Sequence, residues 1–112
     1  FIMKKENIEN MTRGWFIGPF EPSVFRTSNM EVAVKYYQAG DQEHAHYHKV
    51  ATEITVIVSG AVRMSGQYYY RGDIITIEAG QVTDFYAVED TVTTVVKIPG
   101  VNNDKYSAEE MI

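Results

Sequence analysis

Turn-forming residues recur about every 8–12 positions along this chain, and this spacing is the feature that most constrains its fold. The segments between the turns are short and rich in β-branched and aromatic residues, which favours strands. No segment shows a convincing amphipathic-helix pattern. The sequence therefore predicts an all-β barrel or sandwich. The expected strands are residues 15–17, 30–37, the histidine-containing segment after Gly40, 52–59, 61–64, 67–70, 74–77, 82–88 and 91–98.

The chain of 112 residues has the length of a single domain. We expect an N-terminal arm over residues 1–14, a β-barrel over residues 15–100 and a tail over residues 101–112. In the tail, Ser107 and Glu110 have the spacing of a helix-capping box. This spacing predicts a short C-terminal helix.

Charge and composition exclude several kinds of partner. The formal net charge of -5 disfavours binding to nucleic acid or to anionic membranes. No apolar run approaches the length of a membrane span, and the N-terminal residues lack the apolar segment of a signal peptide. The chain contains no cysteine, which agrees with a cytoplasmic location. We therefore expect a cytoplasmic protein that binds neither nucleic acid nor membranes.

The expected strand at residues 52–59 is apolar on both faces. Glu53 begins one face, and Ile54, Val56 and Val58 form the other. A strand that is apolar on both sides in a small antiparallel protein needs a second covering layer. We expect this layer to be another subunit, so that a homodimer forms through this outer face and the N-terminal strands.

All three histidines of the chain, His44, His46 and His48, occupy alternate positions. Alternate side chains of an extended strand point to the same face, so the three imidazoles are predicted to line one side. Glu53 follows at the head of the next strand. Histidines gathered on one strand face beside a carboxylate indicate a functional site.

Five residues in this region carry a family resemblance. Gly40, His46, His48, Glu53 and Gly60 stand at the spacing of the first motif of the cupin superfamily, and the chain resembles that superfamily here at every motif position. The resemblance implies a single-domain cupin β-barrel, with two antiparallel sheets in a jelly-roll arrangement.

The second cupin motif is matched only in part. Gly72 and Gly80 resemble its glycines in spacing. Where the motif usually has a proline, a histidine ligand and an asparagine, this chain has Glu78, Thr83 and Ala87. The resemblance therefore implies that one usual metal ligand is replaced by threonine, a weak donor.

His46, His48 and Glu53 form a two-histidine, one-carboxylate donor set, which suits iron(II) and also accepts zinc, manganese or nickel. The same strand cannot supply His44 as a further ligand. Residues 44 to 48 span about 13 Å at ~3.3 Å per residue, whereas donors lie ~2.0–2.2 Å from an ion. We therefore expect His44 at the rim and Thr83 in the pocket as ligand contacts.

A metal-free chemistry is the alternative. The string His-x-His-Lys that begins at His46 is similar to one in nucleotide-sugar keto-isomerases. This resemblance implies an isomerase or epimerase in which His46 or His48 is the general base and Glu53 orients it. Tyr36 or Tyr86 is then expected to be the acid.

Three functions remain open from the sequence. The first is a small cupin that binds a small polar, carbohydrate-like ligand in the barrel, with or without a divalent metal. The second is the metal-free isomerase or epimerase. The third is a non-catalytic interaction or sensing domain that retains the histidines of its relatives.

Overall fold

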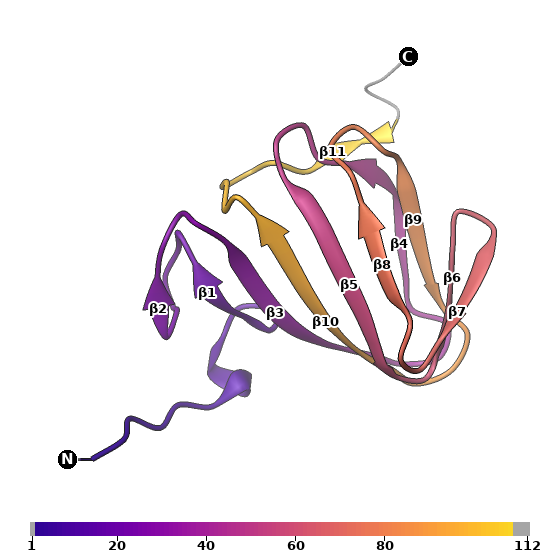
Figure 1. The fold of residues 1–112 in the computed structure, drawn as a ribbon. Helices are drawn as coiled ribbons and strands as arrows, with labels where there is room; N and C mark the ends of the chain where they lie inside the picture. Colours follow the sequence, from indigo (N-terminus) through magenta and orange to yellow (C-terminus); the bar gives the residue numbers. More distant parts are fainter. Residues whose placement is uncertain (1, 109–112) are drawn as a thin grey trace.

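The structure is a computed structural model that describes residues 2–108, in which two β-sheets pack face to face (Figure 1). A 3-10 helix, η1 (Ile8–Asn10), precedes the sheets, and no helix within residues 2–108 is long and apolar enough to cross a membrane. The first sheet contains, in spatial order, β2 (Phe25–Arg26), β1 (Trp15–Gly18), β3 (Glu31–Tyr37), β10 (Thr91–Ile98), β5 (Thr52–Ser59) and β8 (Ile74–Ile77). The second sheet contains β11 (Tyr106–Ser107), β4 (Gln42–Tyr47), β9 (Thr83–Ala87), β6 (Ala61–Met64) and β7 (Gln67–Tyr70).

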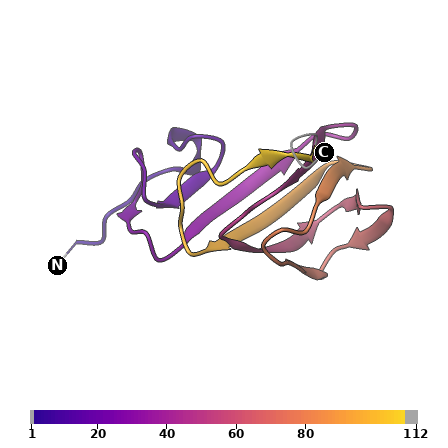
Figure 2. The same cartoon turned by 90° about the horizontal axis from the view of Figure 1, so that it is seen from above.

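Strands that are neighbours in a sheet are mostly distant in the sequence. β3 and β5 both pair with β10, and β4 and β6 both pair with β9, all antiparallel. The chain thus passes from one sheet to the other between consecutive long strands, which is the jelly-roll arrangement. Figure 2 shows the two layers from above, with the N-terminal segment extending away from them. The expectation of an all-β, two-sheet fold is confirmed.

The apolar core fills one end of the space between the sheets. Ile57 of β5 and Val62 of β6 are fully buried there, and Tyr37 packs against this core. Because Glu53 shares a strand face with Ile57, the strand that supplies the core also brings a carboxylate between the sheets. The buried core residues are Ile57, Val62, Met64, Ile77, Phe85 and Ala87.

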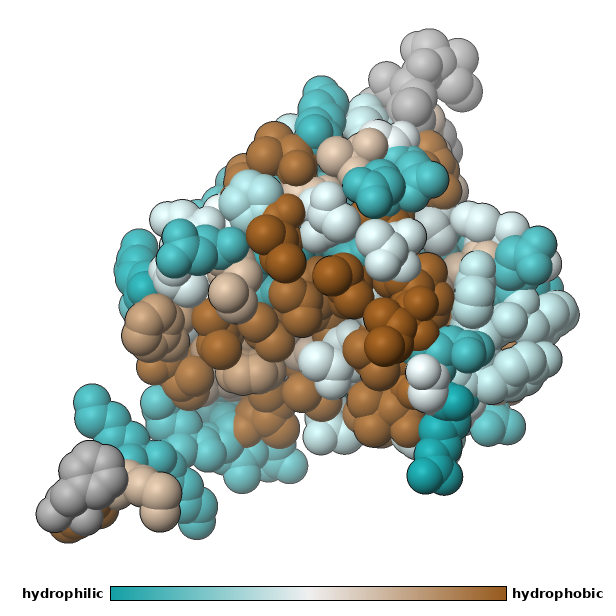
Figure 3. All heavy atoms as spheres, viewed as in Figure 1, coloured by the Kyte–Doolittle hydropathy of each residue, from teal (hydrophilic) through white to brown (hydrophobic). Residues whose placement is uncertain are grey.

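The opposite side of the first sheet presents an apolar surface, which we call the outer apolar face. Alternation along β3, β5, β8 and β10 places no charged side chain on it, and Figure 3 shows apolar residues gathered across these strands. It includes the three residues predicted to share the outer side of β5. The outer apolar face consists of Val32, Val34, Tyr36, Ile54, Val56, Val58, Ile74, Thr76, Val92, Thr94, Val96 and Ile98.

The C-terminal tail adds a strand to the second sheet. In β11, Tyr106 pairs with Tyr47 and Ser107 pairs with His46, and the two tyrosine rings stack at 5.5 Å. Ser107, expected to cap a short helix, is therefore in a strand, and the described part of the tail contains no α-helix. Glu110, the other residue of that expectation, lies outside the described residues.

Candidate functional site

Beside the apolar core lies an open cavity of about 1290 Å³ between the sheets. Residues of β1, β3, β4, β5, β9 and β10 line it, together with residues of the tail and of the segment before β1. His46, His48 and Glu53 all line this cavity. The sheet geometry therefore places the three residues expected to hold a metal in the lining of one cavity.

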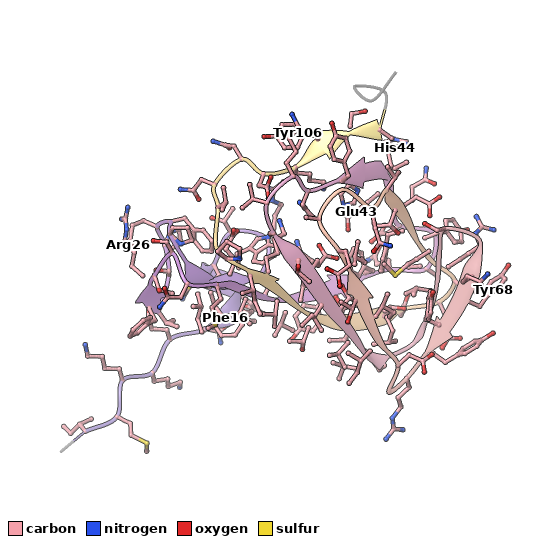
Figure 4. All side chains as sticks on the ribbon, turned by 45° about the horizontal axis from the view of Figure 1, so that its top comes forward. Phe16, Arg26, Glu43, His44, Tyr68 and Tyr106 are labelled. Carbon is pink, nitrogen blue, oxygen red and sulfur yellow. The ribbon has the colours of Figure 1, made fainter. Side chains whose placement is uncertain are left out.

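A β-bulge in β4 decides which residues face the cavity. Glu43 pairs with Phe85 and His46 pairs with Thr83, so three steps along β4 oppose two along β9. The extra residue shifts the alternation, so that Glu43 and His46 both line the cavity while His44 is exposed. In Figure 4, Glu43 lies between the sheets and His44 near the sheet edge. The expectation that three histidines share one face is corrected.

His48 is buried, and both of its ring nitrogens have partners. Its Nδ1 contacts the backbone carbonyl of Asp104, which can only accept a hydrogen bond, so Nδ1 carries a proton. Its Nε2 lies 3.2 Å from Oε1 of Glu53. In the neutral imidazole, Nε2 would then turn a lone pair toward a carboxylate. Such a contact is favourable only when a cation is present, either a proton on Nε2 or a metal ion.

Glu53 is held as an anion by its surroundings. Burial raises the pKa of Glu53, but the hydrogen bond and charge of His48 outweigh this effect, helped by Thr55 and Lys97, so that the pKa lies below its ordinary value. The Thr55 hydroxyl donates a hydrogen bond to Oε2 at 3.0 Å. Glu53 is therefore ionised at neutral pH and can bind a cation.

His46 stands beside this pair. Its Nδ1 lies 2.8 Å from the carbonyl of His44, so Nδ1 carries the proton and Nε2 is the free nitrogen. The rings of His46 and His48 are 5.6 Å apart and nearly perpendicular. Burial lowers the pKa of His46, which favours the neutral form. Neutral imidazole is the form that ligates a metal or accepts a proton.

The donor types fit a transition metal, whereas their present positions do not form a complete site. Within residues 2–108, no three His, Cys, Asp or Glu side chains converge closely enough to hold an ion. Thr83, at the position of the usual second-motif histidine, donates its hydroxyl to the carbonyl of Asp84 at 2.9 Å. It also accepts a hydrogen bond from Ser65 at 3.3 Å. Its hydroxyl is therefore already engaged.

Of the two expected tyrosines, Tyr36 borders the cavity and Tyr86 does not. Tyr36 is 67% exposed on the outer apolar face. Tyr86 lies on the side of β9 opposite Phe85, with the Arg63 guanidinium 5.2 Å from its ring. The expectation of an acid in the cavity is corrected for Tyr86. On β3, Tyr36 and Tyr37 both border the cavity, and Tyr37 is the one that shares a strand face with the inward-facing Lys35.

Tyr37 belongs to a polar network that the sequence did not reveal. The Tyr37 hydroxyl donates to Oε2 of Glu43 at 2.9 Å, and Lys105 donates to Oε1 at 3.0 Å. Burial and the Glu43 charge raise the pKa of Tyr37, so it stays protonated. Burial also raises the pKa of Glu43, but Lys105 and Tyr37 outweigh it and the net pKa is lowered. The sequence did not identify these residues as part of the site, because the alternation of residues along β4 does not reveal the bulge.

Asp104 connects the tail to the loop that follows His48. Its carboxylate accepts hydrogen bonds from the backbone N–H groups of Lys49 at 2.9 Å, Val50 at 3.1 Å and Ala51 at 2.9 Å. Burial raises the pKa of Asp104, but these three hydrogen bonds outweigh it and lower the pKa. One residue therefore fixes both the loop and, through its backbone carbonyl, the tautomer of His48.

Solved structures with the same architecture are known. An uncharacterized conserved protein with a double-stranded β-helix domain from Klebsiella pneumoniae matches with a TM-score of 0.72 and 21% identity, over 97% of this chain and 99% of that chain. KdgF from Halomonas sp. matches with a TM-score of 0.62 and 20% identity, over 69% and 74%. Oxalate decarboxylase from Bacillus subtilis matches with a TM-score of 0.63 and 18% identity, over 75% of this chain and 25% of that chain.

No protein-family model and no curated protein sequence matches the chain. The structural matches nevertheless establish the fold. The protein has the double-stranded β-helix, or cupin, fold that the spacing of its first motif implied.

Proposed function

We propose that the protein binds a small polar, carbohydrate-like ligand in its cavity, at a divalent transition metal held by His46, His48 and Glu53. The contact between His48 and Glu53 carries this proposal. Because the Asp104 carbonyl holds the proton on Nδ1, Nε2 faces a carboxylate that is ionised at neutral pH. Metal-binding histidines characteristically donate their other N–H to a carbonyl or carboxylate in this way.

The donor set suits iron(II), and also zinc, manganese or nickel. The oxalate decarboxylase of similar fold has Mn(II) centres, which supports a metal in this cavity. When bound, the ion would polarise an oxygen of the ligand as a Lewis acid. Side chains of the protein supply further ligand contacts. Tyr37 and Lys105 hold Glu43 beside the site, where its carboxylate would accept hydrogen bonds from ligand hydroxyls.

Metal binding is tested with histidine variants that differ in position. His48→Ala is expected to weaken binding of Zn²⁺ or Mn²⁺ by more than the ~10–100-fold typical of losing a supporting contact, because it removes a ligand. The measurement is calorimetric titration of chelator-treated protein purified without a nickel column. His44→Ala is the matched control and should bind as the wild type does, since His44 is exposed outside the cavity. Equal losses in both variants would contradict the assignment.

A metal-free isomerase or epimerase is the second candidate, favoured by the lack of three converging donors within residues 2–108. In this reaction Nε2 of His46 takes the proton beside the carbonyl of a nucleotide-linked keto-sugar and returns it to the same or the neighbouring carbon. Tyr37, which borders the cavity and whose hydroxyl donates to Glu43, is the candidate acid in place of Tyr86.

Deuterium incorporation from D₂O into a keto-sugar nucleotide distinguishes these candidates. Exchange by metal-free wild type that is lost in His46→Ala supports the isomerase. If a substrate panel shows ligand binding without exchange, the protein is a binding or sensing domain, the third function open from the sequence.

We also propose that the outer apolar face joins two copies of the chain. The face spans four neighbouring strands without a charged side chain, and Ile74 and Val58 on it are 67% and 47% exposed. Exposed apolar surface of this extent is unusual for a monomer and is typical of an interface. A second copy offers a partner of the same chemistry, as a two-fold interface requires.

Val56→Lys places a charge at the centre of this face, and we expect it to convert the dimer into a monomer. The measurement is light scattering coupled to size-exclusion chromatography. Tyr68→Lys is the control, because Tyr68 is 53% exposed on β7 of the other sheet and should not change the mass. A wild-type protein that remains monomeric at high concentration would refute the interface.

A further inference from the structure

We infer that the cavity also holds a subsite for a small organic carboxylate, formed by Lys35, Lys97, Trp15 and Thr93. The inference rests on the proposed function in that it describes the ligand of the same cavity. It adds the charge of that ligand and the residues that select it.

Two lysines meet over one indole ring. Trp15 of β1 pairs with Ala33 of β3, whose small side chain is completely buried. The Lys35 ammonium lies 5.0 Å and the Lys97 ammonium 4.9 Å from the centre of the Trp15 ring. All three side chains line the cavity. The sheet thus gathers two positive charges and an aromatic surface at one place.

The nearby carboxylates are already engaged by other groups. Glu43 accepts from Tyr37 and Lys105, as described above. Glu53 faces His48, and Glu31 accepts from the backbone N–H of Val101 at 2.9 Å. Each acid of this part of the cavity therefore has its own donor.

Lys35 and Lys97 interact with these acids only over longer distances, Lys35 with Glu43 and Lys97 with Glu53. Among residues 2–108, no carboxylate lies within ion-pair distance of either ammonium. Lys35 donates one hydrogen bond, to the carbonyl of Arg13 at 3.3 Å, although an ammonium group has three donors. Burial lowers the pKa of Lys35, and the Glu43 charge offsets this effect only in part. A bound anion would supply a close counter-ion.

Thr93 gives an independent indication of a ligand. Its side chain is 1% exposed, and its hydroxyl has no hydrogen-bond partner within the described chain. Buried polar groups are nearly always hydrogen-bonded, so this hydroxyl is expected to meet a ligand or a water molecule. Thr93 lies directly opposite Lys35 in the pairing of β10 with β3 and lines the same cavity.

The charges present favour a carboxylate over a phosphate. Glu43 and Glu53 are both ionised in this cavity, because their pKa values are lowered. They repel a phosphate dianion more strongly than a singly charged carboxylate. Lys97 lies between Glu31 of β3 and Glu53 of β5 in the sheet, so a carboxylate at Lys97 places the rest of its molecule beside the histidines. The indole covers an apolar surface of the same ligand.

Trp15 is the only tryptophan of the chain, so its fluorescence reports directly on this subsite. The probes are glucuronate and glucuronamide, which differ in charge and hardly in shape. We expect glucuronate to change the fluorescence saturably and to bind at least about tenfold more tightly than glucuronamide, the effect of charge-assisted hydrogen bonds. Equal affinity for the two probes would overturn the inference. Tighter binding of inorganic phosphate than of glucuronate would overturn the choice of a carboxylate.

Lysine variants test which side chains bind the carboxylate of the ligand. Lys35→Met and Lys97→Met are each expected to weaken glucuronate binding by about tenfold and to leave glucuronamide binding unchanged. Lys5→Met is the matched control, since Lys5 is exposed in the N-terminal segment away from this cavity. Glucuronate affinity that is unchanged in both cavity variants, or lowered equally in the control, would overturn the inference.

Metal binding is measured in parallel on the same samples. Lys35→Met should bind Zn²⁺ as the wild type does, because Lys35 supplies no metal ligand. Protein that binds no metal but still prefers glucuronate refutes the metal proposal and supports the carboxylate subsite. Protein that binds metal without preferring glucuronate supports the metal proposal and refutes the carboxylate subsite.

Discussion

Replacing Asp104 with alanine is expected to lower the free energy of unfolding by about 2–4 kcal/mol, because it removes the charged acceptor of several backbone hydrogen bonds. The carboxylate accepts from Lys49, Val50 and Ala51, and Ala51 is buried, so water cannot fully replace it. The tail would also lose its main polar attachment to the loop after β4. Urea unfolding at neutral pH measures the effect. A change below about 0.5 kcal/mol, typical of a surface substitution, would contradict it.

The acid dependence of stability identifies the carboxylate as the cause. The pKa of Asp104 is lowered in the folded protein, so its contribution is complete above the unfolded-state pKa of about 3.9 and is lost as pH falls through the folded-state value. The difference between wild type and Asp104→Asn should therefore shrink as the pH is lowered from 7 to below about 4. A difference that stays constant would indicate lost packing.

Asp104→Ala should also weaken metal binding. The backbone carbonyl of Asp104 holds Nδ1 of His48, and the carboxylate keeps that carbonyl in place. A loosened tail would let the imidazole rotate or change tautomer, which typically costs about 10–100-fold in metal affinity. Asp104 is therefore a positioning residue. Asp104→Asn, which keeps one acceptor oxygen, should restore part of the affinity if position is what matters.

The sequence predicted the layout of the fold because its signals are local. Turn residues and β-branched runs mark each strand, and the motif spacing from Gly40 to Gly60 indicated the cupin fold. The spacing also brought His48 and Glu53 together correctly, since they flank a single loop between β4 and β5.

The errors in the site have two physical causes. First, strand alternation assumes a regular strand, and the bulge between Glu43 and His46 moved one residue out of phase. Second, alternation shows that Tyr36 and Tyr37 face opposite sides of β3, but the apolar side chains stand with Tyr36, and the side that faces the second sheet carries Lys35 with Tyr37. Whether a face is interior depends on the second sheet, whose position no local pattern encodes.

The contacts made by the tail could not be predicted from the sequence either. Asp104 is 56 residues from His48 in the chain and meets it only because β11 pairs with β4. A two-residue strand after a turn-rich segment has no periodicity to detect. Residues that fix the site from a distance are therefore found only in the structure.

The two glycines at the ends of the first motif allow a last, sharply controlled prediction. Gly60 has φ 94° and Gly40 has φ 93°, so alanine suffers the same left-handed strain at both, about 1–2 kcal/mol. Their surroundings differ. A Cβ at Gly60 would lie 2.3 Å from the Thr91 hydroxyl and 2.4 Å from the Asp90 carbonyl, whereas a Cβ at Gly40 would meet nothing within 4 Å.

Gly60→Ala is therefore expected to destabilise the protein by about 4 kcal/mol or more, and Gly40→Ala by only about 1–2 kcal/mol. The neighbours of Gly60 cannot move away cheaply, because one is backbone and Thr91 is 2% exposed, with its hydroxyl donating to the carbonyl of Glu89 at 2.8 Å. Urea unfolding of both variants gives the difference directly. Equal destabilisation would mean that both motif glycines serve backbone conformation alone. A larger loss at Gly60 would show that close packing at the end of β5, the strand that carries Glu53, requires its glycine.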